Sequence, residues 1–510
     1  DVAISGNEIW VAKGTYKPGY DYGLGGGSRY YHFRLKEGIE IYGGFAGTET
    51  AVSQRTNFGS GEANETILSG DLSSNDDFDA SNGGYQGTSG DDNCYHVLYH
   101  PDGLNLTSAT VFDGFTITGG NANGAADPQN KAGALYLYSS SPTIQNVYFH
   151  SNMATGFGGA AYMYNSTSAL STVSFTENIS GGGGAFYISY ASPVLIDCIL
   201  TGNVSSGDGG AFSTHSSSPT LTNALFSSNT AGNNGGAIIF YSNSVQYNAT
   251  LNNVTFSDNI ATANGGGIRF ASNNAASTLN INNSILWGNT ATTSGNELSL
   301  VSTGTTTLNY SCYKNETNDV VVSNGTLTAT NNNTTFNPGF VDPASGDFRI
   351  RGFSPCKNNG LNGYNALTFD IRGEDRIQNT TIDMGAYEWT DGTDPLYNAD
   401  NVVFVDIDAS GANNGSNWTE AFTSLQSALN GATSGVKIWV AKGTYKPEYD
   451  YGLLGGPHVY HFRLIEGVEI YGGFAGTETA VSQRTNFGLG EANETILSGD
   501  LSGDDDFDIN

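Results

Sequence analysis

The sequence predicts an all-β fold, a right-handed parallel β-helix, and three observations lead to this prediction. Between Thr110 and Val301 the sequence repeats with a period of about 25 to 30 residues, the range typical of solenoids. Each repeat has apolar residues at fixed distances before one asparagine, and most have a glycine pair after it. The chain contains 26 Phe and 28 Tyr, whereas a disordered chain of low charge has few aromatic residues. We therefore expect short strands stacked coil on coil.

One asparagine marks each repeat. These anchor residues are Asn152, Asn178, Asn203, Asn229, Asn259 and Asn289. The residue three positions before each anchor is large and apolar: Phe149, Phe175, Leu200, Phe226, Phe256 and Leu286. The residue five positions before is smaller and mostly apolar. These two positions are two residues apart, so both side chains face the same side of a strand. We expect this pair to face the core and the anchors to stack vertically as a structural ladder without a catalytic role.

A bend is expected inside each of these strands. A further apolar residue stands eight positions before each anchor, and the odd step from −8 to −5 breaks the alternation of a straight strand. Position −6, beside the bend, holds Asn146, Thr172, Asp197, Asn223, Asn253 and Asn283. Asn and Asp tolerate unusual backbone angles and can bond along a stack. Glycine pairs such as Gly235-Gly236 predict tight corners, so each coil is expected to contain three short strands.

Residues 9–79 recur almost unchanged at 438–508. The offset between Trp10 and Trp439 is 439 − 10 = 429 residues, and only 10 of the 71 aligned positions differ. Near-identity over this length predicts a recent tandem duplication, so that the chain spans one period and the start of the next. The expected parts are a β-helix at 1–330, a β-rich closing segment at 331–390, a linker at 391–400 and the next near-identical module at 401–510.

The next module is expected to open with a cap. Residues 401–406 are typical of a strand, and a segment with apolar residues at helical spacing runs from Asn417 to Asn430. Asn417 is the expected N-cap, with Glu420 three residues later. Such a helix would cover the open strand edges at the end of a solenoid. Its counterpart for the first module is expected before Asp1.

Composition and charge exclude several classes of function. The 49 acidic and 19 basic residues give a net charge of −30, which repels nucleic acid and anionic lipid. No apolar run reaches 18 residues, so we expect no membrane span, and any secretion signal is expected outside this sequence. The four cysteines are too scattered for a disulfide scaffold or a CxxC metal site. Whether Cys312 and Cys356 pair is left open.

Two motifs carry a resemblance to known proteins. The pairing of Gly235-Gly236-Ala237-Ile238 with Phe226-x-x-Asn229 resembles the repeats of chlamydial polymorphic outer-membrane proteins and related bacterial surface β-helices. The motif Asp383-x-Gly385-Ala386-x-Glu388 is similar to the closing segment of large secreted repeat proteins of the Bacteroidetes type. The resemblance implies a secreted surface passenger or adhesin at the bacterial cell surface.

A non-enzymatic role is expected: a tandem-repeat module of a giant extracellular appendage or adhesin that acts as a stiff spacer and contact element. Two alternatives stay open, a β-helix polysaccharide lyase or glycosidase and a carbohydrate-binding module. A glycosidase needs two carboxylates about 5 to 9.5 Å apart. Glu177 and Asp258 share a repeat position but are three coils apart, roughly 14 Å. We interpret His32 and Arg34 as one face of a strand rather than a catalytic pair. A homo-oligomer or filament and contacts with cell-surface glycans are the expected partnerships.

A loop rich in carboxylates is the candidate metal site. Residues 70–79 recur at 499–508, and both copies carry several aspartates at short spacing. Carboxylate oxygens at such spacing suit Ca²⁺, although the pattern is not that of an EF-hand. The expected ligands are Asp71, Asp77 and Asp79, and the alternative is a solvated acidic loop.

Overall fold

A computed structural model describes residues 3–352, 354–378, 380–390, 401–411, 413, 415–432, 435–447 and 460–501. The chain forms two compact units. The first comprises Asp1–Thr335, Leu361–Gly373 and Met384–Ala386, and the second comprises Phe336–Gly360, Glu374–Asp383 and Tyr387–Asn510. The expected linker at 391–400 lies outside the described residues. Each unit is considered separately below.

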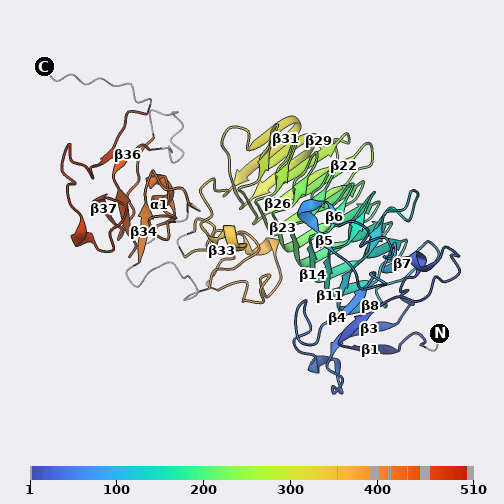
Figure 1. Ribbon diagram of the computed structural model, residues 1–510. Helices are drawn as coiled ribbons and strands as arrows, with labels where there is room; N and C mark the ends of the chain where they lie inside the picture. The colour runs from blue at the N-terminus through green and yellow to red at the C-terminus, as the bar shows by residue number, and fades with distance from the viewer. Residues whose placement is uncertain are drawn as a thin grey trace. The chain divides into compact units, whose positions relative to one another are not determined.

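The first unit is a stack of coils built from parallel strands, so the predicted fold class, an all-β parallel β-helix, is confirmed (Figure 1). The first strands of the coils are β8 (Val111–Thr118), β11 (Thr143–His150), β14 (Ala169–Thr176), β17 (Val194–Thr201), β20 (Thr220–Ser227), β23 (Asn248–Ser257), β26 (Thr278–Asn282) and β27 (Ile285–Trp287). The second are β9 (Asn121–Ala122), β12 (Met153–Ala154), β15 (Ile179–Ser180), β18 (Val204–Ser205), β21 (Thr230–Ala231), β24 (Ile260–Ala261) and β28 (Thr290–Ala291). The third are β7 (Leu98–His100), β10 (Leu135–Tyr138), β13 (Ala161–Tyr164), β16 (Phe186–Ser189), β19 (Phe212–His215), β22 (Ile238–Ser242) and β25 (Ile268–Ser272).

Less regular coils begin and end this stack. The opening strands are β1 (Glu8–Ala12), β2 (Gly14–Tyr16), β3 (Glu40–Phe45), β4 (Thr66–Ser69), β5 (Phe78–Asp79) and β6 (Gly84–Tyr85). The closing strands are β29 (Leu298–Asn309), β30 (Cys312–Tyr313) and β31 (Val320–Asn331). β3 pairs in parallel with both β1 and β8, so the opening strands continue into the regular coils.

Phenylalanine rings fill the solenoid interior. The strands β11 and β14 pair in register, Val147 with Val173 and Phe149 with Phe175. The rings of Phe149 and Phe175 stack at a centroid distance of 4.9 Å, and both side chains are at most 1% exposed. Phe226 stacks on the next coil in the same way and is fully buried. The expected inward register of these residues is therefore confirmed.

The bend column adopts a left-handed backbone. All six residues at position −6 have φ between 47° and 53°: Asn146, Thr172, Asp197, Asn223, Asn253 and Asn283. Asn and Asp accept this conformation more readily than most residues, which explains why they predominate in the column. The strand bends there while the pairing resumes on both sides.

Part of the closing segment lies against this bend column, a contact that the sequence did not reveal. Nδ2 of Asn223 donates a hydrogen bond to the carbonyl of Phe369 (2.8 Å), and Nδ2 of Asn283 donates to that of Leu361 (3.0 Å). The N–H of Gly385 donates to the carbonyl of Asn283 (2.6 Å). Gly385 has φ of 91°, and a Cβ there would meet Ile285 at 2.7 Å. The glycine of the closing motif is thus required by close packing on the coil stack.

The charged ends of the same motif belong to the second unit. The carboxylate of Asp383 accepts hydrogen bonds from the backbone N–H groups of Asn358 (2.5 Å) and Trp389 (2.6 Å). Glu388 accepts from the N–H of Asp383 (3.1 Å) and pairs with Arg376 at 3.8 Å, both side chains being 1% exposed. These contacts close a loop by satisfying buried polar groups, so they give the motif a structural role.

The second unit also contains the start of the repeated module. Its elements are β32 (Phe340–Asp342), β33 (Asp347–Ile350), β34 (Val402–Val405), α1 (Leu425–Gly431), β35 (Lys437–Ala441), β36 (Gly443–Tyr445), β37 (Glu469–Phe474) and β38 (Thr495–Leu497). β34 pairs in parallel with β35, and β35 pairs with β37. Leu425 and Leu429 of α1 are buried against Val403 and Ile438.

The cap helix is shorter than expected. It begins at Leu425, after Ser424, rather than after Asn417. Asn417 instead closes a turn, in which its Oδ1 accepts hydrogen bonds from the N–H groups of Thr419 (2.9 Å) and Glu420 (3.0 Å). Trp418 packs against Phe404 and Phe474, so tertiary contacts hold the preceding residues in a nonhelical conformation.

The structure also bears on the cysteine pair and on the membrane span. Cys94, Cys198, Cys312 and Cys356 are all buried and form no disulfide, so Cys312 and Cys356 are not paired with each other in this structure. Among the described residues, no helix has the length and apolarity needed to cross a membrane.

Candidate functional site

The anchor asparagines form a continuous hydrogen-bonded column, here called the asparagine ladder: Asn152, Asn178, Asn203, Asn229, Asn259 and Asn289. At each step, the backbone N–H and Nδ2 of one asparagine donate to Oδ1 of the next, as Asn178 does to Asn203 at 3.0 and 3.1 Å. Nδ2 of Asn203 also donates to the carbonyl of Phe175 at 2.9 Å. All six side chains are at most 3% exposed, so the column satisfies buried polar groups and offers no reactive surface.

A glutamate occupies the place where the next asparagine of the ladder would stand. The backbone N–H and Nδ2 of Asn289 both donate to the carboxyl group of Glu297. Glu297 is fully buried, and burial raises the pKa of its carboxyl to about 8. The ladder therefore ends on a carboxyl group whose two oxygens both face Asn289, and its perturbed pKa has a structural origin.

The three expected calcium ligands do not converge in the structure. Asp71 accepts hydrogen bonds from the backbone N–H groups of the four residues Ser73 to Asp76, the closest being Ser74 at 2.6 Å. Asp79 caps a short 3₁₀ turn by accepting from the N–H of Ser81 (2.9 Å), and the side chain of Asp77 is exposed. No group of three or more His, Cys, Asp or Glu side chains within the described parts of the chain is arranged to hold a metal ion.

In this loop Asp76, which is not one of the three expected ligands, has a strongly raised pKa. Burial raises the pKa of Asp76 to about 7, with the neighbouring carboxylates of Asp71 and Asp92 adding to the effect. Asn93 is fully buried, and its Nδ2 donates to Asp76 at 3.0 Å. Sequence spacing did not single out Asp76, because its partners Asp92 and Asn93 come from beyond the β5–β6 hairpin. The second copy of this loop, beyond Leu501, lies outside the described residues.

Calcium binding by the loop at residues 70–79 stays a prediction. Binding would neutralise carboxylates that repel one another and would raise the unfolding midpoint by mass action. Thermal melts in millimolar CaCl₂ and in chelator are expected to differ by a few degrees, and Asp71→Asn is expected to reduce the difference. Equal midpoints in both buffers, together with no bound ion in elemental analysis, would rule calcium out.

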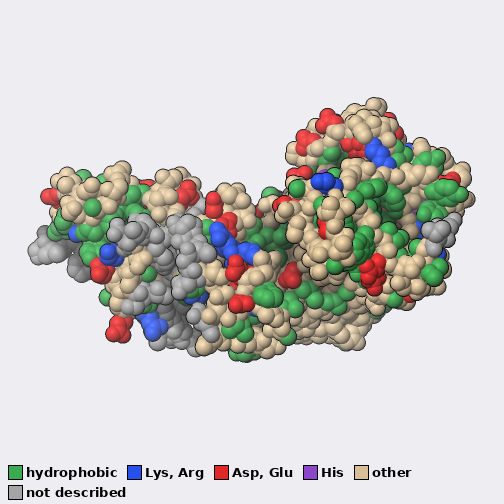
Figure 2. Space-filling model, turned by 90° about the horizontal axis from the view of Figure 1, so that it is seen from below, with side chains coloured by type: hydrophobic (Ala, Val, Ile, Leu, Met, Phe, Trp, Pro, Cys, Tyr) green, Lys and Arg blue, Asp and Glu red, His purple; other side chains and the backbone are tan. Residues whose placement is uncertain are grey.

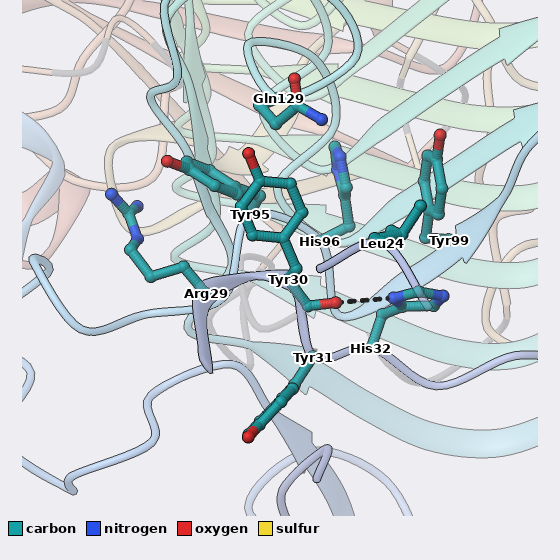
Figure 3. A pocket seen from close by; sticks show the side chains of 9 residues that line it. All are labelled: Leu24, Arg29, Tyr30, Tyr31, His32, Tyr95, His96, Tyr99 and Gln129. Atoms are coloured by element: carbon teal, nitrogen blue, oxygen red, sulfur yellow. Dashed lines mark hydrogen bonds between the residues drawn. The ribbon is translucent and has the colours of Figure 1, made fainter. Parts of the chain in front are cut away.

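A small, partly open pocket lies beside the first coils of the first unit and has room for about one water molecule (Figure 3). Its lining residues are Leu24, Arg29, Tyr30, Tyr31, His32, Tyr95, His96, Tyr99 and Gln129. The aromatic rings of Tyr30, Tyr95, His96 and Tyr99 gather around the space, whereas the ring of Tyr31 points away from them. The pocket therefore combines aromatic rings with a few polar groups.

Hydrogen bonds fix the cationic and imidazole groups of this pocket. The Arg29 guanidinium donates to the carbonyls of Asn93 (2.8 Å) and Asn121 (2.9 Å) and lies 4.2 Å over the ring of Tyr95. His32 Nδ1 donates to the carbonyl of Tyr30 (2.9 Å), and Arg34 donates to His32 Nε2 (3.2 Å). His32 and Arg34 are thus on one side, although a single bridge between Phe33 and Leu98 replaces the expected strand.

His96, one of two buried histidines in the pocket, is neutral. His96 Nδ1 donates to the carbonyl of Ala132 at 2.8 Å, and its ring stacks on Tyr99 at 4.9 Å. Burial lowers the pKa of His96 to about 4 and also lowers the pKa of His32. The nine lining residues include no carboxylate. The imidazole of His96 is therefore uncharged at neutral pH.

Several charged groups of the solenoid are tied into structural contacts. Asp113 pairs with Arg55 at 3.0 Å and accepts a hydrogen bond from Asn146 at 2.9 Å. Asp197 accepts from Asn223 at 3.0 Å within the bend column, and Asp208 accepts from Asn234 at 2.9 Å. Figure 2 shows one face of the molecule, on which uncharged polar side chains and backbone predominate and acidic groups are more frequent than basic ones.

Two comparisons with known proteins give a match. Residues 244–363 match a family model described as a domain of unknown function, DUF5123. A search of curated proteins gave no match. Among solved structures, the pectate lyase Pel9A is similar with a TM-score of 0.39 and 14% sequence identity, over 76% of this chain and 89% of the lyase.

Proposed function

We propose that this chain is a non-enzymatic tandem-repeat module of a giant extracellular bacterial appendage or adhesin, in which it acts as a stiff spacer and contact element. The near-identical second copy carries the proposal. A protein that repeats a module of this size gains length and multiplicity of contacts, whereas catalysis requires a single constellation of reactive groups. The resemblance of its repeats to bacterial surface β-helices supports secretion to the cell surface.

The two copies of the module share one local architecture. β1 pairs with β3 through Ile9 and Ile41, and β35 pairs with β37 through the equivalent Ile438 and Ile470, with an irregularity at the same place. Arg55 donates a hydrogen bond to the carbonyl of Gly43 (2.9 Å), and the equivalent Arg484 donates to that of Gly472 (2.7 Å). Copies that fold alike support the use of the module as a building block.

Stiffness follows from continuous stacking of coils. The phenylalanine stack and the asparagine ladder both run through successive coils, so bending one coil relative to the next would break buried contacts. A solenoid of this kind suits a spacer that holds a contact surface away from the cell.

Incubation with polysaccharides tests the absence of turnover. Purified chain with polygalacturonate, alginate, xylan and mannan is expected to release neither unsaturated nor reducing ends, because the carboxylates of Asp113, Asp197 and Asp208 are engaged in structural contacts. Asp76→Asn serves as a matched variant, since Asp76 has the strongly raised pKa of a candidate acid. Product release that this substitution abolishes would contradict the proposal and favour a lyase or glycosidase.

The complete gene is expected to contain further copies of Ile-Trp-Val-Ala-Lys-Gly-Thr-Tyr.

A further inference from the structure

A column of aromatic rings runs along the outer side of the third strands. Successive strands place Tyr138 beside Tyr164, and His215 beside Tyr241, in parallel register. The rings of the first pair stack at 4.5 Å and those of the second at 5.6 Å. Tyr241 is 39% exposed. We call the column of Tyr138, Tyr164, Tyr190, His215 and Tyr241 the aromatic ladder.

The coil between those of Tyr164 and His215 lacks a ring at this register and supplies one from the next residue. Ser189 occupies the position between Tyr164 and His215. The ring of Tyr190 fills the gap and contacts Tyr164 at 5.8 Å and His215 at 5.4 Å. Tyr190 has φ of 50°, a left-handed conformation that is uncommon for a bulky residue. Because its side chain is 49% exposed, burial offsets little of the free-energy cost of this conformation, which indicates a role at the surface.

We propose that the aromatic ladder binds an extended, uncharged glycan chain aligned with the solenoid axis. This inference rests on the proposed function, because it names the chemistry of the surface that the module contacts. Coils repeat at about 4.8 Å, and the stacked pairs cover each other's faces, so the ladder offers the outer edge of one ring per coil to successive sugar units. Tyrosine combines an apolar ring with a hydroxyl group, and a sugar ring likewise presents apolar C–H groups and hydroxyls.

The width of the ladder favours a glycan over a protein partner. A stable protein interface buries roughly 800 Å² on each side and has an apolar centre. The ladder is one ring wide, and the residues at the left-handed turn beside it are small and polar: Ser139, Asn165 and Ser216. Hydroxyl and amide groups beside stacked rings match the alternating polar and apolar surface of a single polysaccharide chain.

Charge favours a neutral glycan over an acidic one. The chain carries a net charge of −30, which repels polyanions. Burial lowers the pKa of His215, so the imidazole adds no positive charge to the ladder at neutral pH. Hydroxyl-rich ligands without carboxylates are therefore the better match to this face.

Affinity electrophoresis of the full 510-residue chain tests the proposal. Native gels containing mannan, xyloglucan or hydroxyethyl cellulose serve as neutral probes, and a gel with polygalacturonate is the acidic counterpart. At least one neutral polymer is expected to retard the chain, and polygalacturonate is not. Calorimetric titration with a hexasaccharide of the retarding polymer then gives the dissociation constant.

Two substitutions separate binding from folding. In Tyr164→Ser the new residue repeats Ser189 of the same column, and in Tyr190→Asn it repeats Asn165 of the same turn. Each is expected to weaken binding about tenfold with an unchanged unfolding midpoint. Tyr20→Ser is the control, because Tyr20 is 68% exposed and lies off the ladder, so its binding is expected to be unchanged.

The outcomes that overturn the inference differ from those that overturn the proposed function. Lack of retardation by every neutral polymer, or retardation that both ladder variants retain, would refute glycan binding and leave the spacer role standing. Self-association that Tyr164→Ser abolishes in sedimentation would assign the ladder to a second copy of the chain. Release of sugar products would refute the non-enzymatic function and not the location of the binding site.

Discussion

Replacing Asn203 by alanine is expected to lower the free energy of unfolding by about 3 kcal/mol, because each buried polar group left without a partner costs about 1 to 3 kcal/mol. Oδ1 of Asn203 accepts two hydrogen bonds from Asn178, and its Nδ2 donates to Asn229 and to the carbonyl of Phe175. The substitution interrupts the asparagine ladder in the middle of the solenoid. Chemical denaturation followed by circular dichroism measures the loss.

Two further variants separate hydrogen bonding from packing. Asn203→Asp keeps the size of the side chain but replaces its donor by an oxygen that faces acceptors, so it is expected to destabilise at least as much as alanine at neutral pH. Asn233→Ala, at an exposed position one coil further on, is expected to change stability by less than about 0.5 kcal/mol. Equal stability of Asn203→Ala and the unaltered chain would show that the ladder contributes nothing to folding.

Truncation of Phe175 to alanine is expected to cost about 3 to 5 kcal/mol, the usual range for a phenylalanine in a packed core. Its side chain is fully buried and stacks against Phe149 at 4.9 Å and Phe186 at 5.6 Å. A rigid coil stack cannot collapse readily into the space that the ring leaves, so the cavity adds to the loss of buried apolar area. The unfolding midpoint in denaturant reports the change.

Phe157 provides the matched control for this substitution. It is 39% exposed and contacts Tyr187 on the outer side of the solenoid. Phe157→Ala is therefore expected to cost less than about 1 kcal/mol. Similar losses for Phe157→Ala and Phe175→Ala would contradict the inward register of the phenylalanine column.

The sequence revealed the periodic part of the molecule because each coil repeats the same local constraints. Alternation along a strand places Phe149 and Val147 on one face, and the odd step at Asn146 requires a bend. The structure has this inward register and the left-handed bend. The anchors stack because each occupies the same place in its coil, so equivalent residues such as Asn178 and Asn203 lie one above the other although the coils differ in length.

Features without a period escaped prediction. The pocket joins His32 to His96 and Tyr99 through loops of unequal length, and no local pattern reports how such loops meet. The predicted start of the cap helix after Asn417 was wrong, because Trp418 packs with Phe474 and this contact overrides helical propensity.

The sequence by itself determined the parallel β-helix, its inward phenylalanine column and the duplication of the module, since these depend on local geometry repeated many times. Only the tertiary structure decided which polar side chains meet. It placed Asp71 in a turn rather than beside Asp77 and Asp79, and it showed that Tyr190 replaces a missing ring next to Ser189. Such contacts depend on the path of loops and on single backbone angles, which no repeat in the sequence specifies.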